Sequence, residues 1–308
     1  MKALVYHGPG QSSWDQVPDP GIKDAGDAVV RVDAVTICGT DLHILEGDVP
    51  DVAPGTVLGH EAVGEVVEIG GDVRSVRPGD RVLVSCICAC GRCRFCKEAR
   101  YGQCLGGGGW VLGHLIDGTQ AEYVRVPFAD LSVHPLPHSV ASNDAVMLAD
   151  IFPTAYEVGV LNGAVRPGDT VAVIGAGPIG LAAIVTARLL TPARIIAVDL
   201  AESRLQAARR LGADAIVEAS EAPEDLISDL TDGFGAEDLW IRDVTITTGL
   251  VDTCTTPVLL RMASAGRLDL SSLVTHTFPL EGMEEAYDVF STPAESGALK
   301  VVLNRPAA

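Results

Sequence analysis

The first half of the chain alternates short apolar runs with polar breaks. The runs are rich in Val and Ile, and Gly, Pro and Asp separate them, as in Arg77-Pro-Gly-Asp80. Short β-branched runs bounded by turn residues predict strands of an irregular β-barrel or sandwich rather than βαβ units. The predicted strands are Lys2–Tyr6, Ala28–Ile37, Ala62–Ile69, Arg81–Cys86 and Ala121–Val126.

From about residue 170 the pattern changes to apolar strands that alternate with helical stretches. This alternation predicts one half of a doubly wound parallel sheet, and so an α/β fold class for the chain. The predicted strands are Thr170–Ile174, Arg194–Val198 and Ala215–Glu218. The predicted helices are Leu181–Leu190, Ser203–Leu211, which stops at Gly212, and Pro223–Thr231.

A glycine-rich turn, Gly175-Ala-Gly177-Pro178-Ile179-Gly180, joins the first of these strands to its helix. Gly175 permits a tight turn, Gly177 lets a pyrophosphate approach the backbone, and Gly180 lets the helix pack on the strand. Asp199 ends the next strand about 20 residues later, where an acid binds the ribose hydroxyls of NAD and repels the extra phosphate of NADP. We assign Arg204 to the same cofactor site. A glycine-rich turn without a ligand is the alternative.

Composition narrows the class of protein. The chain has 308 residues, enough for two domains, and its 47% hydrophobic share and 33 glycines fit an α/β enzyme. A net charge of −19 argues against nucleic acid and against an anionic membrane surface. The longest apolar stretch, Val171–Ala187, contains the glycine-rich turn, so it does not predict a transmembrane helix.

Eight cysteines are present, and half of them lie in one loop at spacings that can close a tetrahedral zinc site. A Cys₄ site has no open position, so its role is to fold a lobe, here about residues 88–106. The four are Cys90, Cys93, Cys96 and Cys104. Cys86 and Cys88, just upstream, are possible rival ligands.

Disulfides are the alternative for these thiols, and they require an oxidising compartment. Met1–Pro9 has the pattern of a strand and not of a secretory segment. We therefore expect a cytoplasmic protein with reduced, metal-binding cysteines.

Three further candidate ligands lie in separate loops. Cys38 follows a predicted strand, His60 precedes one, and Asp150 stands at a predicted helix start where Pro153 is tolerated. A catalytic zinc keeps three protein ligands and one open position. Spacing alone makes this trio only a suggestion, since a lone Cys or His is commonly a satisfied core residue.

The motifs together resemble the zinc-dependent medium-chain alcohol dehydrogenases. They are Cys38-Gly-Thr-Asp41, Gly59-His60-Glu61-x-x-Gly64, the four-cysteine lobe and the dinucleotide turn, in that order. The resemblance implies a GroES-like catalytic domain over residues 1–155 and 268–308, with a Rossmann domain inserted over 156–267. It also implies two zinc ions and NAD per chain, hydride transfer between an alcohol and an aldehyde or ketone, and a homodimer or homotetramer.

The resemblance also implies a role for individual residues. Cys38, His60 and Asp150 would hold the catalytic zinc, with Glu61 as an occasional fourth ligand. Asp41 would orient a ligand histidine, Thr40 would bond the alcohol oxygen, His43 would pass its proton to solvent, and Lys300 would reach the pyrophosphate. Ordinary loop hydrogen bonding is the alternative for Thr40 and His43. Trp110 is either a wall of the substrate pocket or a buried residue under the zinc lobe.

The chain departs from the family pattern at one point. Between Ala236 and Glu237 it lacks about 40 residues, the expected fourth and fifth strands of the Rossmann sheet with their helices. Val244–Gly249 resembles the sixth strand, which must then pair with Thr170–Ile174 or lose its place. The chain is therefore either an active dehydrogenase with a repacked domain or a deletion form that binds zinc with impaired catalysis. The zinc-free quinone reductase branch is disfavoured, because both ligand sets are present.

Overall fold

The computed structural model describes residues 1–220 and 245–306, and the chain forms two compact units. Unit 1 comprises Met1–Pro153 and Val251–Ala308, and unit 2 comprises Thr154–Leu250. Unit 1 is β-rich and unit 2 contains a parallel sheet, so the predicted α/β class is confirmed. In this division the second boundary lies after residue 250, and α9 (Thr256–Ser264), which contacts η2 (Val146–Leu148), belongs to unit 1.

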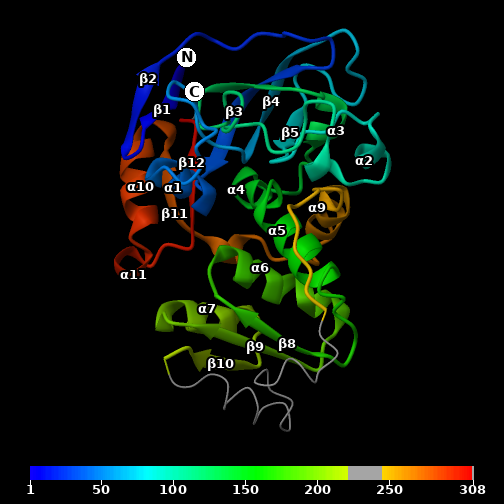
Figure 1. Ribbon diagram of the computed structural model, residues 1–308, viewed down its shortest axis with the longest axis vertical. Coiled ribbons are helices and arrows are strands. Elements are labelled where there is room, and N and C mark those ends of the chain that lie inside the picture. The colour runs from blue at the N-terminus through cyan, green and yellow to red at the C-terminus, as the bar shows by residue number, and fades with distance from the viewer. Residues whose placement is uncertain (221–244, 307–308) are drawn as a thin grey trace. The chain divides into compact units, whose positions relative to one another are not determined.

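Unit 1 is built on a seven-stranded sheet with the order β11-β12-β3-β4-β5-β7, and β6 also pairs with β3 (Figure 1). All pairs are antiparallel except β11 with β12. The strands are β3 (Ala28–Thr36), β4 (Ala62–Ile69), β5 (Arg81–Val84), β6 (Tyr123–Val126), β7 (Val133–Pro135), β11 (Val274–Pro279) and β12 (Lys300–Asn304). A separate hairpin contains β1 (Lys2–Gly8) and β2 (Gln11–Gln16).

The end of the chain completes this sheet. Val302–Asn304 of β12 pair with Ala34–Thr36 of β3, and the Thr36 hydroxyl donates to the carbonyl of Val301 at 2.7 Å. All the valines of the long β3 are buried, and Val30, Val32 and Val35 belong to the main hydrophobic core of unit 1. The C-terminal segment thus lies in the same unit as Met1–Pro153.

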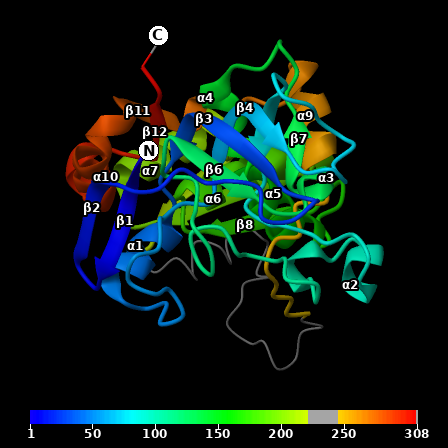
Figure 2. The ribbon, with the colours of Figure 1, turned by 90° about the horizontal axis from the view of Figure 1, so that it is seen from above.

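Short helices occupy the connections of unit 1, and α10 packs on β2, β11 and β12 (Figures 1 and 2). The elements before unit 2 are α1 (Gly39–Glu46), α2 (Arg94–Lys97), η1 (Tyr101–Gln103), α3 (Ala129–Ser132), α4 (Ser142–Ala145), η2 (Val146–Leu148) and α5 (Ile151–Thr154). Those after it are α9 (Thr256–Ser264), η6 (Ser271–Leu273), η7 (Leu280–Gly282), α10 (Met283–Ser291) and α11 (Pro293–Ser296).

Unit 2 has a three-stranded parallel sheet in the order β10-β9-β8. Its strands are β8 (Thr170–Ile174), β9 (Arg194–Asp199) and β10 (Ala215–Glu218), and the matching predictions are confirmed to within a residue. The helices in the described part of this unit are η3 (Ala155–Leu161), α6 (Pro178–Ala187), η4 (Arg188–Leu190) and α7 (Glu202–Leu211). In the described part of the chain β8 pairs with β9 alone, and Ile174 at its end is 80% exposed.

The sequence predicts that Val244–Gly249 either pairs with Thr170–Ile174 or loses its place, and the second outcome holds for its described part. Residues 245–249 form no strand, and Ile246 is 85% exposed. An extended segment needs a neighbour to satisfy its backbone groups, and no described strand pairs with this one. Val244, the predicted helix Pro223–Thr231 and the junction of Ala236 with Glu237 lie outside the described residues.

Across residues 1–220 and 245–306, no helix has both the length and the apolar character needed to cross a membrane.

Candidate functional site

Four side chains from three loops of unit 1 bring their ligand-type atoms together. Each of these atoms lies within 4.8 Å of every other, and the residues are Cys38, His60, Glu61 and Asp150. Cys38 precedes α1, His60 and Glu61 precede β4, and Asp150 precedes α5. The sheet therefore assembles the trio that spacing only suggested, with Glu61 beside it.

The three donor types face a common point. The Cys38 Sγ and the His60 Nε2 lie 3.6 Å and 3.5 Å from the same oxygen, Oδ2 of Asp150. His60 is 4% exposed, so water has little access to its ring. Sulfur, imidazole nitrogen and carboxylate oxygen are the donor atoms that zinc takes in catalytic sites.

The electrostatics of this cluster also fit a cation. Burial opposes charge on His60, but its contacts with Asp150 and Cys38 raise the pKa of the imidazole well above its ordinary value. Burial raises the pKa of the Glu61 and Asp41 carboxyl groups. Several buried acidic groups crowd one imidazole, an arrangement that a bound divalent cation would stabilise.

Asp41 lies behind His60. Its Oδ2 accepts from the Cys38 backbone N–H at 2.9 Å and from the Gln120 amide at 3.0 Å. Its buried Oδ1 lies 3.8 Å from the His60 Nδ1 and has no hydrogen-bond partner among the described residues. The Tyr287 hydroxyl in turn donates to the side-chain oxygen of Gln120, Oε1, at 2.7 Å. No local motif marks Gln120 or Tyr287, so sequence reasoning missed both.

Glu61 is held by a buried ion pair. The Lys300 ammonium donates to Glu61 Oε2 and to the Ile37 carbonyl, both at 2.8 Å, and the lysine is 1% exposed. Burial opposes charge on Lys300, but the Glu61 carboxylate keeps the pKa of the amine above its ordinary value. Contact between Lys300 and a pyrophosphate stays a prediction, and it requires the amine to leave this pair.

The predicted relay residues differ in exposure. The Thr40 hydroxyl is 3.6 Å from the Cys38 Sγ, at the edge of the cluster. The His43 side chain is 64% exposed, and its Nδ1 lies 3.1 Å from Asp48 and 3.5 Å from Glu46. His43 thus borders solvent, and its relay role stays a prediction.

Trp110 borders the same cluster. The Trp110 and His60 rings lie edge to face with 6.3 Å between their centroids, and the Trp110 ring stacks on His114 with a centroid distance of 4.1 Å. The Trp110 Nε1 is buried and has no hydrogen-bond partner in the described residues. Trp110 is partly buried against the core of unit 1, and the choice between a pocket wall and a packing residue stays open.

The four-cysteine loop forms a second cluster, and its sulfur atoms also lie within 4.8 Å of one another. Backbone N–H groups point at the sulfurs, since Cys96 and Leu105 donate to Cys93 at 3.5 Å and 3.4 Å. These backbone donors lower the pKa of Cys93 to about 6. Burial raises the pKa of Cys96 in the same cluster to about 12, so the support for a closed Cys₄ zinc site comes from the convergence of the four sulfurs and from the backbone donors at Cys93.

Cys86 and Cys88, the possible rival ligands, lie outside the four-cysteine cluster. Cys88 is buried in the core, and burial raises its pKa to about 12. Cys86 is also buried, and its Sγ lies 3.6 Å from Oδ1 of Asp150. Cys86 therefore contacts the other cluster, a position that its distance in sequence from Asp150 did not indicate.

The glycine-rich turn of unit 2 has the expected local geometry. Gly175 has a φ of +91°, which favours glycine. A Cβ on Gly180 would lie 1.9 Å from the Gly175 carbonyl oxygen, so only glycine lets α6 approach β8 this closely. Gly177 is the N-cap of α6, Pro178 and Ile179 follow, and a Cβ on Gly177 would meet nothing within 4 Å.

Asp199 stabilises this turn through hydrogen bonds to the backbone. Its Oδ2 accepts from the Ala176 N–H at 2.7 Å, and its Oδ1 accepts from the Ala201 N–H at 2.8 Å. The Arg204 guanidinium lies 3.9 Å from the same carboxylate. The cofactor roles of these residues stay predictions.

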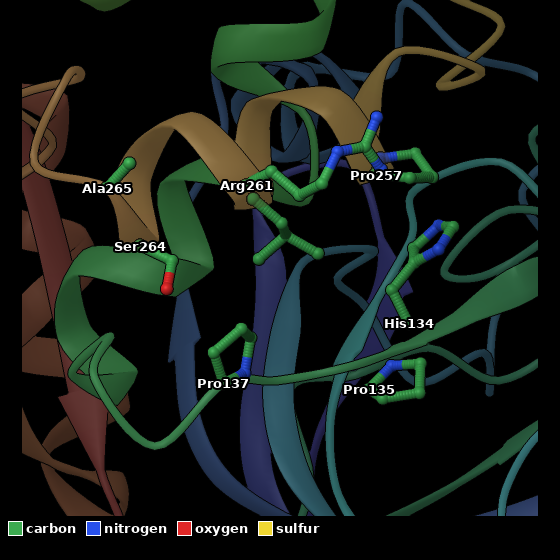
Figure 3. Close-up of a pocket in the computed structure, with 8 residues that line it drawn as sticks. His134, Pro135, Pro137, Pro257, Arg261, Ser264 and Ala265 are labelled. Carbon is green, nitrogen blue, oxygen red and sulfur yellow. The ribbon is translucent and has the colours of Figure 1, made fainter.

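Unit 1 also has a cavity of about 520 Å³ between β7 and α9 (Figure 3). It contains none of the candidate ligands. The residues that line it are His134, Pro135, Pro137, Pro257, Leu260, Arg261, Ser264 and Ala265. Burial lowers the pKa of His134 to about 4, and its Nε2 has no partner in the described part of the chain.

Two family models match parts of the chain. Residues 24–138 match the family model described as the alcohol dehydrogenase GroES-like domain, and residues 178–253 match the zinc-binding dehydrogenase model. An alcohol dehydrogenase of Cupriavidus necator is 34% identical, with 98% of each chain covered.

Solved structures are similar over nearly the whole chain. Zinc-dependent alcohol dehydrogenase 2 from Streptococcus pneumoniae, in its apo form, has a TM-score of 0.94 and 42% identity, with 100% of this chain and 99% of that chain covered. An Escherichia coli alcohol dehydrogenase complexed with NADH has a TM-score of 0.86 and 27% identity, with 99% of each chain covered. The chain belongs to the zinc-dependent medium-chain alcohol dehydrogenase family.

The alignment with the Cupriavidus enzyme also bears on the missing segment. It extends over 363 positions, whereas this chain has 308 residues. The relative therefore has residues with no counterpart here, in agreement with the predicted shortening.

Proposed function

We propose that the protein is an NAD-dependent zinc oxidoreductase that interconverts an alcohol and an aldehyde or ketone. One observation carries the proposal: the ligand atoms of Cys38, His60, Glu61 and Asp150 converge within 4.8 Å in a buried part of unit 1. The names of the relatives support the reaction class, and the NADH in the Escherichia coli structure supports the cofactor.

Cys38, His60 and Asp150 would hold the catalytic zinc, and the four cysteines of the lobe would hold a structural one. A zinc ion with an open position supplies Lewis-acid polarisation of an alcohol or carbonyl oxygen. Asp41 would keep the His60 ring in place from the Nδ1 side, at its present separation of 3.8 Å.

Two residues of α1 would carry out the proton transfer. The Thr40 hydroxyl lies beside Cys38 and would accept the proton of the alcohol group. His43, 64% exposed and beside Asp48, would exchange that proton with solvent. Glu61 would act as an occasional fourth ligand only when it turns from Lys300, its partner at 2.8 Å.

The glycine-rich turn would bind the cofactor in unit 2. Gly177 leaves open space at the start of α6, where backbone N–H groups receive the pyrophosphate. Asp199 is buried at the end of β9, where an acidic residue favours ribose hydroxyls over the phosphate of NADP.

A second candidate is a shortened form with impaired turnover. The observation that favours it is the missing sixth strand, since residues 245–249 form none and β8 pairs with β9 alone in the described residues. The wall that strands four to six normally give the nicotinamide would then be incomplete. Zinc would bind in this form, but hydride transfer would be slow.

A cofactor titration separates the two. The purified, zinc-loaded chain would be titrated with NADH and with NADPH, following cofactor fluorescence, and then assayed with a panel of primary and secondary alcohols. Saturable NADH binding with alcohol oxidation supports the dehydrogenase. NADH binding without turnover supports the impaired form. Absence of binding by either nucleotide refutes the NAD-dependent function, and sedimentation of the same sample gives the oligomeric state.

A further inference from the structure

Cys86 contacts the candidate catalytic cluster without belonging to it. Its side chain is 3% exposed, and its Sγ lies 3.6 Å from Asp150 Oδ1. The other oxygen, Oδ2, is the one that faces the Cys38 Sγ and the His60 Nε2. In these contacts Oδ1 of Asp150 faces the Cys86 thiol, and Oδ2 faces the candidate zinc ligands Cys38 and His60.

The backbone fixes this contact. The Cys86 N–H donates to the carbonyl of Ala149 at 3.1 Å, so the backbone at Cys86 is bonded to the residue that precedes Asp150. On the other side, the Ser85 hydroxyl accepts from the Ile87 N–H at 3.2 Å and bonds the Thr253 hydroxyl at 2.9 Å. The loop after β5 therefore holds the thiol against one oxygen of the carboxylate.

We propose that Cys86 is a positioning residue that fixes Asp150 as a one-oxygen zinc ligand. The thiol S–H donates to Oδ1, which leaves Oδ2 directed at the metal position. Carboxylate ligands depend on such outer hydrogen bonds for their orientation. This inference rests on the proposed function, because it assumes a zinc ion held by Cys38, His60 and Asp150.

The test compares three variants of the full chain with the structural zinc in place. Cys86→Ala removes the donor, Cys86→Ser keeps a donor of similar size, and Cys88→Ala is the matched control. Cys88 is as deeply buried as Cys86, at 0% against 3% exposure, but lies in the core and not in the cluster. Thermal melts show whether each variant folds.

The readouts do not depend on turnover. Competition with a chelator gives the zinc affinity of the second site, and the visible spectrum of the Co²⁺-substituted site reports its coordination geometry. We expect Cys86→Ala to weaken zinc binding by roughly 10–100-fold and to change the Co²⁺ spectrum. Cys86→Ser should stay within about threefold of the wild type, because its hydroxyl also donates. Cys88→Ala should leave both readouts unchanged.

Different outcomes refute the proposed function and the inference about Cys86. If the wild-type chain binds only the zinc of the four-cysteine lobe, the proposed function fails. If it binds two zinc ions and Cys86→Ala matches it in affinity and spectrum, the inference about Cys86 alone is wrong. An equal loss in Cys88→Ala would also overturn it, because the effect would then be one of core packing.

Discussion

Gly177→Ala separates folding from cofactor binding in unit 2. The new Cβ would meet no atom within 4 Å, and the φ of −71° suits alanine. Alanine restricts the unfolded chain, which stabilises by about 0.4–1 kcal/mol, but it is a poorer N-cap than glycine by a similar amount. We therefore expect the free energy of unfolding to change by less than about 1 kcal/mol.

NADH binding should respond differently. The methyl group would occupy the open space at the start of α6, where the pyrophosphate must reach backbone N–H groups. We expect the dissociation constant for NADH to rise at least about tenfold, equivalent to about 1.4 kcal/mol.

Gly180→Ala is the contrasting variant, because it should affect folding rather than the space for the cofactor. Its Cβ would lie 1.9 Å from the Gly175 oxygen and 3.3 Å from Val173 Cγ1, so α6 must move away from β8. Overpacking of this kind costs about 1–3 kcal/mol of stability. Gly21→Ala in unit 1, which also meets nothing within 4 Å, is the control for adding a methyl group.

The assay pairs urea unfolding with NADH fluorescence titration on each variant. NADH binding by Gly177→Ala equal to that of the wild type would show that the turn is not the phosphate site. Wild-type stability in Gly180→Ala would refute the steric reasoning.

Three further changes test other parts of the structure. Lys300→Met leaves Glu61 buried without its cation and should lower the free energy of unfolding in urea by about 3–5 kcal/mol. The double variant with Glu61→Gln should recover part of this loss, and strict additivity would contradict the ion pair. Cys104→Ser should lose one zinc of two by elemental analysis, and retention of both would count against the lobe site. His134 has a folded pKa of about 4, below its ordinary 6.5, so the unfolded chain takes up the proton first as the pH falls. Wild-type stability should therefore decrease between pH 6.5 and 4 by up to about 3 kcal/mol, and His134→Gln should lose less over the same window. Identical pH profiles would refute the burial argument.

Local patterns predicted much of the fold. β4, β8 and β10 begin and end at the predicted residues, because runs of β-branched residues bounded by turns form strands in most contexts. Residues 245–249 have the same composition but form no strand, because a strand also depends on a neighbour that the local sequence does not specify.

The site was predictable only in pieces. Spacing identified Cys38, His60 and Asp150 as loop residues, and the family resemblance grouped them before the sheet topology showed their convergence. The partner of Glu61 lies 239 residues away in β12, a separation at which no periodic pattern operates. Cys86 contacts Asp150 from 64 residues away for the same reason.

The place of β12 in the sheet constrains how the protein is made. Residues 300–304 lie between β11 and β3, so the sheet that begins with residue 28 stays open during most of translation. Unit 2 is one continuous segment and emerges from the ribosome before that gap can close. Until then Glu61 has no ammonium partner, and Ala34–Thr36 of β3 lack their pairing strand, which leaves a short edge of the kind that can pair with other chains. Late ribosomal pausing, or a nascent chain that terminates before β12, would therefore expose unit 1 to misassembly rather than merely remove one strand.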